Sequence, residues 1–455
     1  MEYLFIDIKR LVAISFLFTF SLLFLSYSYA DEEGWPVKAG DRVFSSPVIA
    51  DLDGDSKSEV IISSVSAGVY VYQCNGQLAS GWPKATTHEF RSSPSIGNLD
   101  GDSELEIVVC TCDRITDTVI ENYVYAYNYD GTILSGFPIS VTNTRITSTP
   151  AIGNISGSAS PEIVVLAGDL RIYAWHTDGS IVNNYPRMLN SDGVLDSTGN
   201  IILTSSPALA NTDGDEELEI FVGTTGFYFY YLDSDTHMSS YYTNDSWVLS
   251  SPAVANVDNS QNGSYEIVVG GGDGYIYAFD IEGGVITPYI IWPYIGTKGL
   301  VYSSPALADI DGATDNHLEI VCGSYDNKVY IWNTNRSLLT GWPQETRGCV
   351  LGSPVVADVD GDNKPEIIVG SSGRKVYIWN DDGTLLEGWP KTLTTNIYSS
   401  PAVGDLDGDG RISIVIAEFN GNVYQWELSY DASESTYTND WKMFGRDASR
   451  CSWVE

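Results

Sequence analysis

The chain has 455 residues, with 60 acidic and 23 basic side chains and a formal net charge of −37. Nucleic acid and anionic membrane surfaces are poor partners for a molecule with this excess of negative charge. Bound divalent cations would neutralise it, which favours a protein that carries metal ions.

The first thirty residues have the pattern of a secretory signal peptide. Lys9 and Arg10 precede an apolar run over residues 11–25, and Ser28-Tyr29-Ala30 offers small residues for a signal peptidase. We expect cleavage after Ala30. The apolar run is shorter than the roughly 20 residues that span a bilayer, which favours cleavage over the alternative, an uncleaved membrane anchor. The sequence therefore predicts a secreted protein, extracellular or periplasmic.

From residue 31 onward one pattern recurs eight times. It consists of Ser-Ser-Pro or a close variant, a short apolar stretch, an Asp-rich turn, an apolar strand and a strand with two aromatic residues. The prolines that mark the copies are Pro47, Pro94, Pro150, Pro207, Pro252, Pro305, Pro354 and Pro401. Their spacing of roughly 50 residues is that of propeller repeats. We predict an all-β fold, a β-propeller of eight four-stranded blades in one domain over residues 31–455, with a closing tail at about 428–455. Seven blades, with one repeat diverged, is the alternative.

Residues 353–390 show how one copy reads as a blade. Small residues at 353–357 suit an innermost strand, and the continuous apolar run at 366–370 suits a strand buried on both faces. A third strand is predicted at 376–379. A fourth is predicted at 385–390, where the final Gly-Trp-Pro is compatible with an outer edge.

The third strand of every copy carries two aromatic residues two positions apart. Because side chains at i and i+2 share one face of a strand, each pair should pack against a neighbouring blade. We therefore assign these residues to the core rather than to ligand stacking. The pairs are Tyr70/Tyr72, Tyr125/Tyr127, Tyr173/Trp175, Tyr228/Tyr230, Tyr277/Phe279, Tyr330/Trp332, Tyr377/Trp379 and Tyr424/Trp426.

The chain both starts and ends with a segment that resembles a fourth strand, at Trp35-Pro36 and at Trp441. One of the two completes the eighth blade. If it is the N-terminal one, the ring closes without a free sheet edge. The sequence alone leaves the choice open.

The Asp-rich turn after the first strand reads Asp-x-Asp-Gly-Asp-x-x-x-Glu. Carboxylates at alternate positions of a tight loop converge, and glycine at position four permits the bend. Hard oxygen ligands suit Ca²⁺, whereas zinc or copper would favour His or Cys. The predicted calcium ligands of the four full copies are Asp51, Asp53, Asp55 and Glu59; Asn98, Asp100, Asp102 and Glu106; Asn211, Asp213, Asp215 and Glu219; and Asp358, Asp360, Asp362 and Glu366.

The other four copies depart from this pattern. The sixth has an insertion and the eighth has Ser413 at position nine; their candidate ligands are Asp309, Asp311, Asp315 and Glu319, and Asp405, Asp407 and Asp409. The third copy keeps Glu162 as its only carboxylate and is predicted to bind no ion. The fifth, with Asp258 and Glu266, is stretched and is not counted as a site. Asp, Asn and Gly are also ordinary turn residues, so plain turns are the alternative reading.

Together, the period and the acidic loop resemble the FG-GAP/VCBS family of calcium-binding propellers, found in integrin α-subunits and many secreted bacterial proteins. The resemblance covers about residues 34–455, and the tail at 441–447 is similar to a closing segment of secreted propellers. It implies several structural Ca²⁺ ions that hold the hairpin between the first two strands. It implies little about the ligand, because such propellers serve several functions.

We expect a non-catalytic binding or adhesion module for an extracellular protein or glycan. The histidines are scattered over different copies, and no nucleophile or base motif is evident. A calcium-dependent, polysaccharide lyase-like enzyme and a cell-envelope assembly scaffold are the alternatives. Two insertions, at 113–122 and 187–204, lie on the predicted face opposite the acidic loops and are the expected ligand surface.

Overall fold

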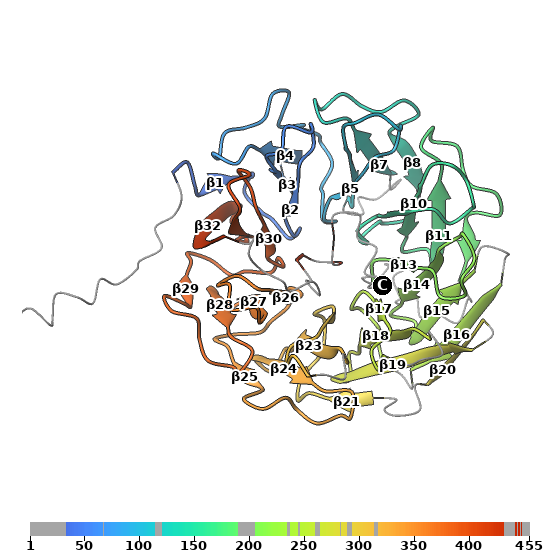
Figure 1. Ribbon diagram of the computed structural model, residues 1–455. Coiled ribbons are helices and arrows are strands. Elements are labelled where there is room, and N and C mark those ends of the chain that lie inside the picture. The colour runs from blue at the N-terminus through green and yellow to red at the C-terminus, as the bar shows by residue number, and fades with distance from the viewer. Residues whose placement is uncertain are drawn as a thin grey trace, which may run out of the picture.

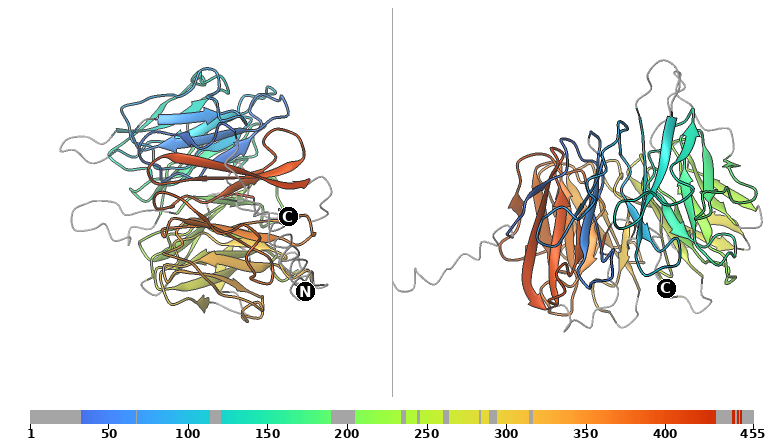
Figure 2. Two further views of the ribbon diagram at one scale, coloured as in Figure 1. Left: turned by 90° about the vertical axis from the view of Figure 1, so that its left-hand side faces the viewer. Right: turned by 90° about the horizontal axis from the view of Figure 1, so that it is seen from above.

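The computed structural model describes residues 33–66, 68–113, 121–189, 205–233, 237–243, 246–259, 264–282, 284–288, 294–313, 317–431, 442–443, 445 and 447. The predicted signal peptide and most of both long insertions lie outside these residues. Within them, the chain forms eight antiparallel sheets arranged around a central axis (Figure 1). Edge-on views show the sheets side by side in one ring (Figure 2). The prediction of an eight-bladed, all-β propeller is confirmed.

Each blade starts with a three-residue strand at the axis. These inner strands are β2 (Val48–Ala50), β5 (Ser95–Gly97), β9 (Ala151–Gly153), β13 (Ala208–Ala210), β17 (Ala253–Ala255), β22 (Ala306–Ala308), β26 (Val355–Ala357) and β30 (Ala402–Gly404). Small side chains predominate here, as expected where eight blades crowd together.

The second strands are buried, mostly apolar runs, except for the exposed Arg411 at the start of the last one. They are β3 (Glu59–Ser64), β6 (Glu106–Cys110), β10 (Glu162–Leu166), β14 (Glu219–Gly223), β18 (Glu266–Gly270), β23 (Glu319–Gly323), β27 (Glu366–Ser371) and β31 (Arg411–Ala417). Seven of them begin with the glutamate that ends the repeated loop, at position nine in five blades and at position eleven in the fifth and sixth. Burial on both faces follows because each sheet is covered by a neighbouring blade on either side.

The third strands carry the aromatic pairs. They are β4 (Gly68–Tyr72), β7 (Glu121–Tyr127), β11 (Arg171–Trp175), β15 (Tyr228–Leu232), β19 (Tyr275–Glu282), β24 (Lys328–Trp332), β28 (Lys375–Trp379) and β32 (Asn422–Asp431). The pair Tyr377 and Trp379 is typical, with ring centroids 4.9 Å apart and nearly parallel planes. Trp379 is only 2% exposed, and thirteen of the sixteen aromatics are buried, which agrees with a packing role. Tyr70, Tyr173 and Tyr228 are half-buried.

The outer strands are short and less regular. They are β8 (Ile139–Thr142), β12 (Arg187–Met188), β16 (Met238–Tyr242), β20 (Val285–Pro288), β25 (Gln344–Glu345), β29 (Lys391–Thr392) and, for the last blade, β1 (Val37–Lys38); β21 (Tyr294–Gly296) also pairs with β19. In the first blade, isolated bridges from Tyr72 to Leu78 and from Val69 to Lys84 take this place.

The predicted fourth strand over residues 385–390 is wrong in its position. Leu385 makes a single bridge to Trp379, and the strand proper is β29, which follows Gly-Trp-Pro rather than ending in it. Gly388 has φ of 83°, a left-handed conformation that interrupts a strand. The interruption turns the Trp389 ring onto Trp426 of the next blade, with centroids 5.4 Å apart.

The N-terminal segment, not the C-terminal one, completes the eighth blade. Val37 pairs with Val423 and Lys38 with Asn422, so β1 is the outer strand of the sheet β1-β32-β31-β30. Trp441 lies outside the described residues, and two described residues of the C-terminal tail lie at the inner edge instead. Met443 bridges Ala402 of the inner strand β30, and the Val403 amide donates to the Lys442 carbonyl at 2.9 Å. The two ends of the chain therefore occupy opposite edges of one blade.

A closed circle of hydrogen bonds joins the blades at the axis. The second residue of each Ser-Ser-Pro motif donates its backbone N–H to the hydroxyl of the same residue in a neighbouring blade, over 2.7–3.1 Å. The circle runs through Ser46, Ser93, Thr149, Ser206, Ser251, Ser304, Ser353, Ser400 and back to Ser46. The first serine instead binds within its own blade, as Ser45 does to the Ser63 carbonyl at 2.7 Å.

Candidate metal centres

The first blade shows how the sequence shapes each acidic loop. The Asp51 carboxylate accepts from the Gly54 amide at 2.9 Å and from the Ser56 amide at 2.9 Å, so it caps the turn from within. Gly54 has φ of 74°, a conformation that favours glycine. Six blades repeat the bond to the loop glycine, at 2.7–2.9 Å.

The glutamate at position nine is directed into the loop by the sheet. Glu59 pairs with Ala50, the residue just before the loop, and its Oε2 accepts the Leu52 amide at 3.0 Å. Seven blades share this bond between the glutamate and the second loop residue, at 2.5–3.0 Å. One carboxylate oxygen of the glutamate thus holds the backbone of the loop, and the other remains available for a further partner.

In five blades the loop carboxylates converge. Each of the three offers an oxygen, and the three oxygens lie within 4.8 Å of one another. The groups are Asp51, Asp53 and Glu59; Asp100, Asp102 and Glu106; Asp213, Asp215 and Glu219; Asp309, Asp311 and Glu319; and Asp358, Asp360 and Glu366. Each of the four full copies and the sixth blade thus brings three of its four candidate ligands together.

In the absence of a cation, burial and repulsion from the aspartates raise the pKa of these glutamates. Burial, reinforced by the neighbouring aspartates, raises the pKa of Glu59, Glu106 and Glu219 to about 7. The same causes raise the pKa of Glu319 to about 8 and that of Glu366 to about 9. A divalent cation in each loop would remove this penalty.

The fourth blade supplies independent evidence that its loop suits a cation. Glu219 is fully buried, and its Oε1 has no hydrogen-bond partner among the described residues. A buried carboxylate oxygen without a partner is costly. Three carboxylates around a tight loop, with backbone carbonyls and water to add, match the hard oxygen ligands that Ca²⁺ takes. The residues present therefore fit the calcium that the family resemblance implies.

The third blade has replaced the cation by hydrogen-bond donors. Glu162 Oε1 accepts from the Ser156 and Ser158 hydroxyls at 2.5 and 2.6 Å, and His176 Nδ1 lies 3.2 Å away. The other oxygen, Glu162 Oε2, accepts the Ile155 amide at 2.9 Å. This arrangement gives a physical reason for the prediction that the third loop binds no ion, since the buried carboxylate already accepts three hydrogen bonds.

The remaining loops differ in detail. In the eighth blade, Asp405 and Asp407 cap the turn, but Ser413 at position nine binds the Gln425 amide at 2.8 Å, and Asp409 lies 3.5 Å from Arg411. In the sixth blade, the predicted ligand Asp315 lies outside the described residues. Asp55 and Asp362 are not among the converging groups; each accepts a backbone amide, from Lys57 and Lys364.

Neighbouring loops are tied to each other. The Leu105 amide of the second blade donates to the Leu52 carbonyl in the loop of the first, at 3.0 Å. Ser58 of the first blade makes the same contact to Leu406 of the eighth, at 2.8 Å. A loop that is held rigid by an ion would therefore also steady the contact between two blades.

The comparisons agree with this geometry. An FG-GAP-like repeat matches residues 358–416, which run from the acidic loop of the seventh blade into β31. No curated protein matches the chain. The fold and the repeat together define the class: an eight-bladed β-propeller that carries an FG-GAP-like repeat.

Solved structures share the fold at low sequence identity. Sqt1 of Saccharomyces cerevisiae is 12% identical over 89% of this chain and 99% of that one, with a TM-score of 0.61. BamB from Moraxella catarrhalis is 13% identical over 86% and 98%, with a TM-score of 0.53. The computationally designed Ika8 protein is 15% identical over 88% and 100%, also with a TM-score of 0.53. At these identities the likeness concerns the fold alone.

Proposed function

We propose that this protein is a secreted, calcium-binding propeller that acts as a non-catalytic binding module for an extracellular protein or glycan. The observation that carries the proposal is the convergence of three carboxylates in five loops, one of them with a buried, unpartnered glutamate oxygen. Bound calcium would neutralise these carboxylates, which otherwise repel one another, and would hold each loop rigid. A ring stiffened in this way is a suitable scaffold for a binding surface.

The non-catalytic part of the proposal is supported by how two histidines are used. His176 contacts Glu162, whose oxygens are already occupied by the loop of the third blade. His88 Nδ1 contacts Asp113, which also accepts the Glu89 amide at 2.7 Å. Both contacts hold loops in place.

In the part of the chain that the structure describes, we find no helix that could span a membrane.

Thermal unfolding tests the calcium part directly. The chain from residue 33 onward would be melted in EDTA, in millimolar Ca²⁺ and in millimolar Mg²⁺. We expect Ca²⁺ to raise the melting temperature by on the order of 10 °C, because ions that bind only the folded state stabilise it. Mg²⁺ should do much less, since it demands a tighter octahedral site. Equal curves in EDTA and Ca²⁺ would refute calcium binding.

A matched pair of variants locates the effect. Asp213→Asn with Asp215→Asn removes two of the converging carboxylates of the fourth blade, whereas Glu216→Gln removes an exposed carboxylate beside them. The double variant should lose part of the calcium-induced shift, and in EDTA it should melt no lower than the parent, because two repelling charges are gone. The control should keep the whole shift. A scan of immobilised glycans and surface proteins in Ca²⁺ then tests the binding role.

A further inference from the structure

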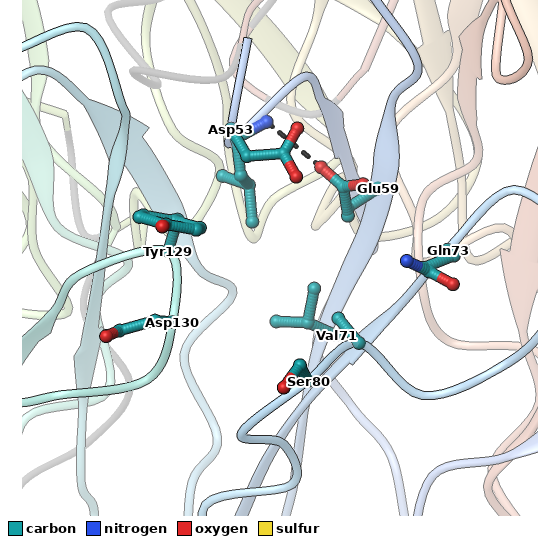
Figure 3. Close-up of a pocket in the computed structure, with 9 residues that line it drawn as sticks. Asp53, Glu59, Val71, Gln73, Ser80, Tyr129 and Asp130 are labelled. Carbon is teal, nitrogen blue, oxygen red and sulfur yellow. Dashed lines mark hydrogen bonds between the residues drawn. The ribbon is translucent and has the colours of Figure 1, made fainter. Parts of the chain in front are cut away.

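A cavity opens beside the acidic loop of the first blade, at its junction with the second (Figure 3). Its volume is about 220 Å³. One wall comes from the first blade: Asp53 and Glu59 of the acidic loop, Gln73 after β4, and Ser80. The other wall is the hairpin turn of the second blade, with Tyr129 and Asp130.

The cavity shares two of its residues with a candidate metal centre. Asp53 and Glu59 belong to the converging group of the first blade, and both line the cavity. Glu59 is 7% exposed, and its Oε2 is used by the Leu52 amide. Figure 3 shows both carboxylates at one end of the opening. Because Ca²⁺ takes six to eight oxygen ligands, an ion held by this loop has room for oxygens supplied from the cavity.

The turn that carries Tyr129 is held in position by the first blade. The Trp82 indole of the first blade donates to the Tyr129 carbonyl at 2.9 Å, which joins the two turns. Gly81 lets them approach closely, since a Cβ there would lie 2.1 Å from the Asp130 carbonyl oxygen. Tyr129 itself is 40% exposed. The backbone that presents the Tyr129 ring to the cavity is thus held by the first blade.

No other comparable turn among the described blades offers an aromatic ring. The residue two positions after the third strand is Tyr129 in the second blade; in four other blades it is Cys74, Thr177, Thr334 or Asp381. Gln73 is distinct too, because the equivalent Asn128, Asn333 and Asn380 bind a hydroxyl of their own turn. The exposed Gln73 amide is directed toward the cavity (Figure 3).

The lining chemistry selects a class of ligand. Three carboxylates (Asp53, Glu59 and Asp130) and no basic residue line the cavity, which disfavours an anionic ligand. Hydrogen bonds from the Thr132 amide and hydroxyl hold the pKa of Asp130 below its usual value, so Asp130 is charged at neutral pH. A neutral, hydroxyl-rich ring can donate to carboxylates, accept from Gln73 and Ser80 and pack on Tyr129. The volume lies below the roughly 300–1,000 Å³ of drug-sized pockets, which suits one sugar ring.

We propose that this cavity is a calcium-dependent glycan site, in which one neutral sugar residue stacks on Tyr129 and contributes hydroxyl oxygens to the ion of the first blade. The proposal rests on the proposed function, since it requires calcium in that loop. It adds the ligand class, the place on the ring and the residues that recognise it.

Saturation-transfer NMR tests the site with defined probes. The methyl glycosides of mannose, galactose, fucose and N-acetylglucosamine would be offered to the protein in millimolar Ca²⁺ and again in EDTA. We expect at least one glycoside to receive saturation in Ca²⁺ and none in EDTA. Tyr129→Ala should weaken the binding about tenfold, the usual size of one aromatic contact. Tyr325→Ala, which removes a tyrosine that is 48% exposed elsewhere, should leave it unchanged.

The outcomes separate this proposal from the proposed function. A calcium-induced rise in melting temperature without saturation of any glycoside would overturn the glycan site and leave the calcium propeller standing. Saturation that persists in EDTA would overturn the role of the ion in the cavity. Binding that survives Tyr129→Ala but is lost in Tyr325→Ala would place the ligand elsewhere. The melting curve of Tyr129→Ala shows whether that variant is folded.

Discussion

At the scale of single residues, two side chains per repeat decide most of the structure. The glutamate at position nine belongs both to the sheet, through the inner strand, and to the loop, through the amide of the second loop residue. The second residue of Ser-Ser-Pro belongs both to its own blade and, through its hydroxyl, to the neighbouring one. Each therefore couples local structure to the assembly of the ring.

The raised pKa values of the glutamates predict how stability depends on pH. The pKa in the folded state lies at about 7 to 9, above the ordinary 4.5, so the unfolded chain releases these protons first. Without calcium, stability should therefore fall as pH rises from 5 to 9. With calcium the fall should be reduced or reversed, because the ion competes with protons. Melting curves across this range, in EDTA and in Ca²⁺, check both statements; a flat profile in EDTA would contradict them.

The hydroxyl circle makes a prediction for one atom. Ser353→Ala removes the acceptor of the Ser304 amide, which is buried, and leaves an unpaired N–H. We expect a loss of about 1–3 kcal/mol in the free energy of unfolding. Ser337→Ala, which removes an exposed hydroxyl bound to Asn333, is the matched control and should cost less. Denaturant unfolding measures both, and equal losses would mean that the circle contributes no more than a surface contact.

At the scale of the element, Gly-Trp-Pro is a contact between blades rather than a strand. Trp342 of the sixth blade packs against Trp379 of the seventh, with centroids 5.9 Å apart, and donates to the Asp381 carbonyl at 2.9 Å. The equivalent contact joins Trp82 to Tyr127. Composition alone suggests an edge strand here, because tryptophan and proline are both acceptable at an outer edge. The structure shows that the tryptophan packs against the next blade instead.

Replacing the glycine of Gly-Trp-Pro should lower the stability of the protein. A Cβ at Gly341 would lie 2.0 Å from the Asp382 carbonyl oxygen, and φ is +92°. We expect Gly341→Ala to destabilise the protein by more than the roughly 1–3 kcal/mol of backbone strain alone. Gly101→Ala is the control, with φ of +84° and no atom within 4 Å of the new Cβ. Unfolding of both in EDTA excludes effects on calcium; similar losses would show that the close approach adds nothing.

At the scale of the whole molecule, closure depends on a strand from the far end of the chain. The outer edge of the eighth blade is covered by β1, and its inner edge is lined by the segment at Met443. Trp35 connects the eighth blade to the first, since its indole donates to the Cys74 carbonyl at 3.0 Å. The first and eighth blades are thereby joined at the outer rim and at the axis.

Deleting residues 33–40 should open the ring. The variant loses the burial of Trp35 and Val37, worth about 3–6 kcal/mol together, and exposes the edge of β32 to other chains. We expect a lower melting temperature and species heavier than the monomer, seen by light scattering. The chain from residue 33 onward is the control. A monomeric deletion variant with an unchanged melting temperature would show that β1 is dispensable.

The sequence by itself determined the fold class and the core aromatics; it favoured eight blades over seven, and it marked the acidic residues that converge in five loops. These follow from local patterns repeated about every 50 residues, and repetition amplifies a weak signal. Only the tertiary structure decided which chain end closes the ring, because both ends carry similar residues and the choice depends on pairing across nearly the whole chain. It also decided that Gln73, Ser80 and Tyr129 share a cavity with Asp53 and Glu59. Tyr129 gave a signal, as an aromatic residue in a polar turn, but its partners lie in another blade, and the packing of neighbouring blades creates the space between them.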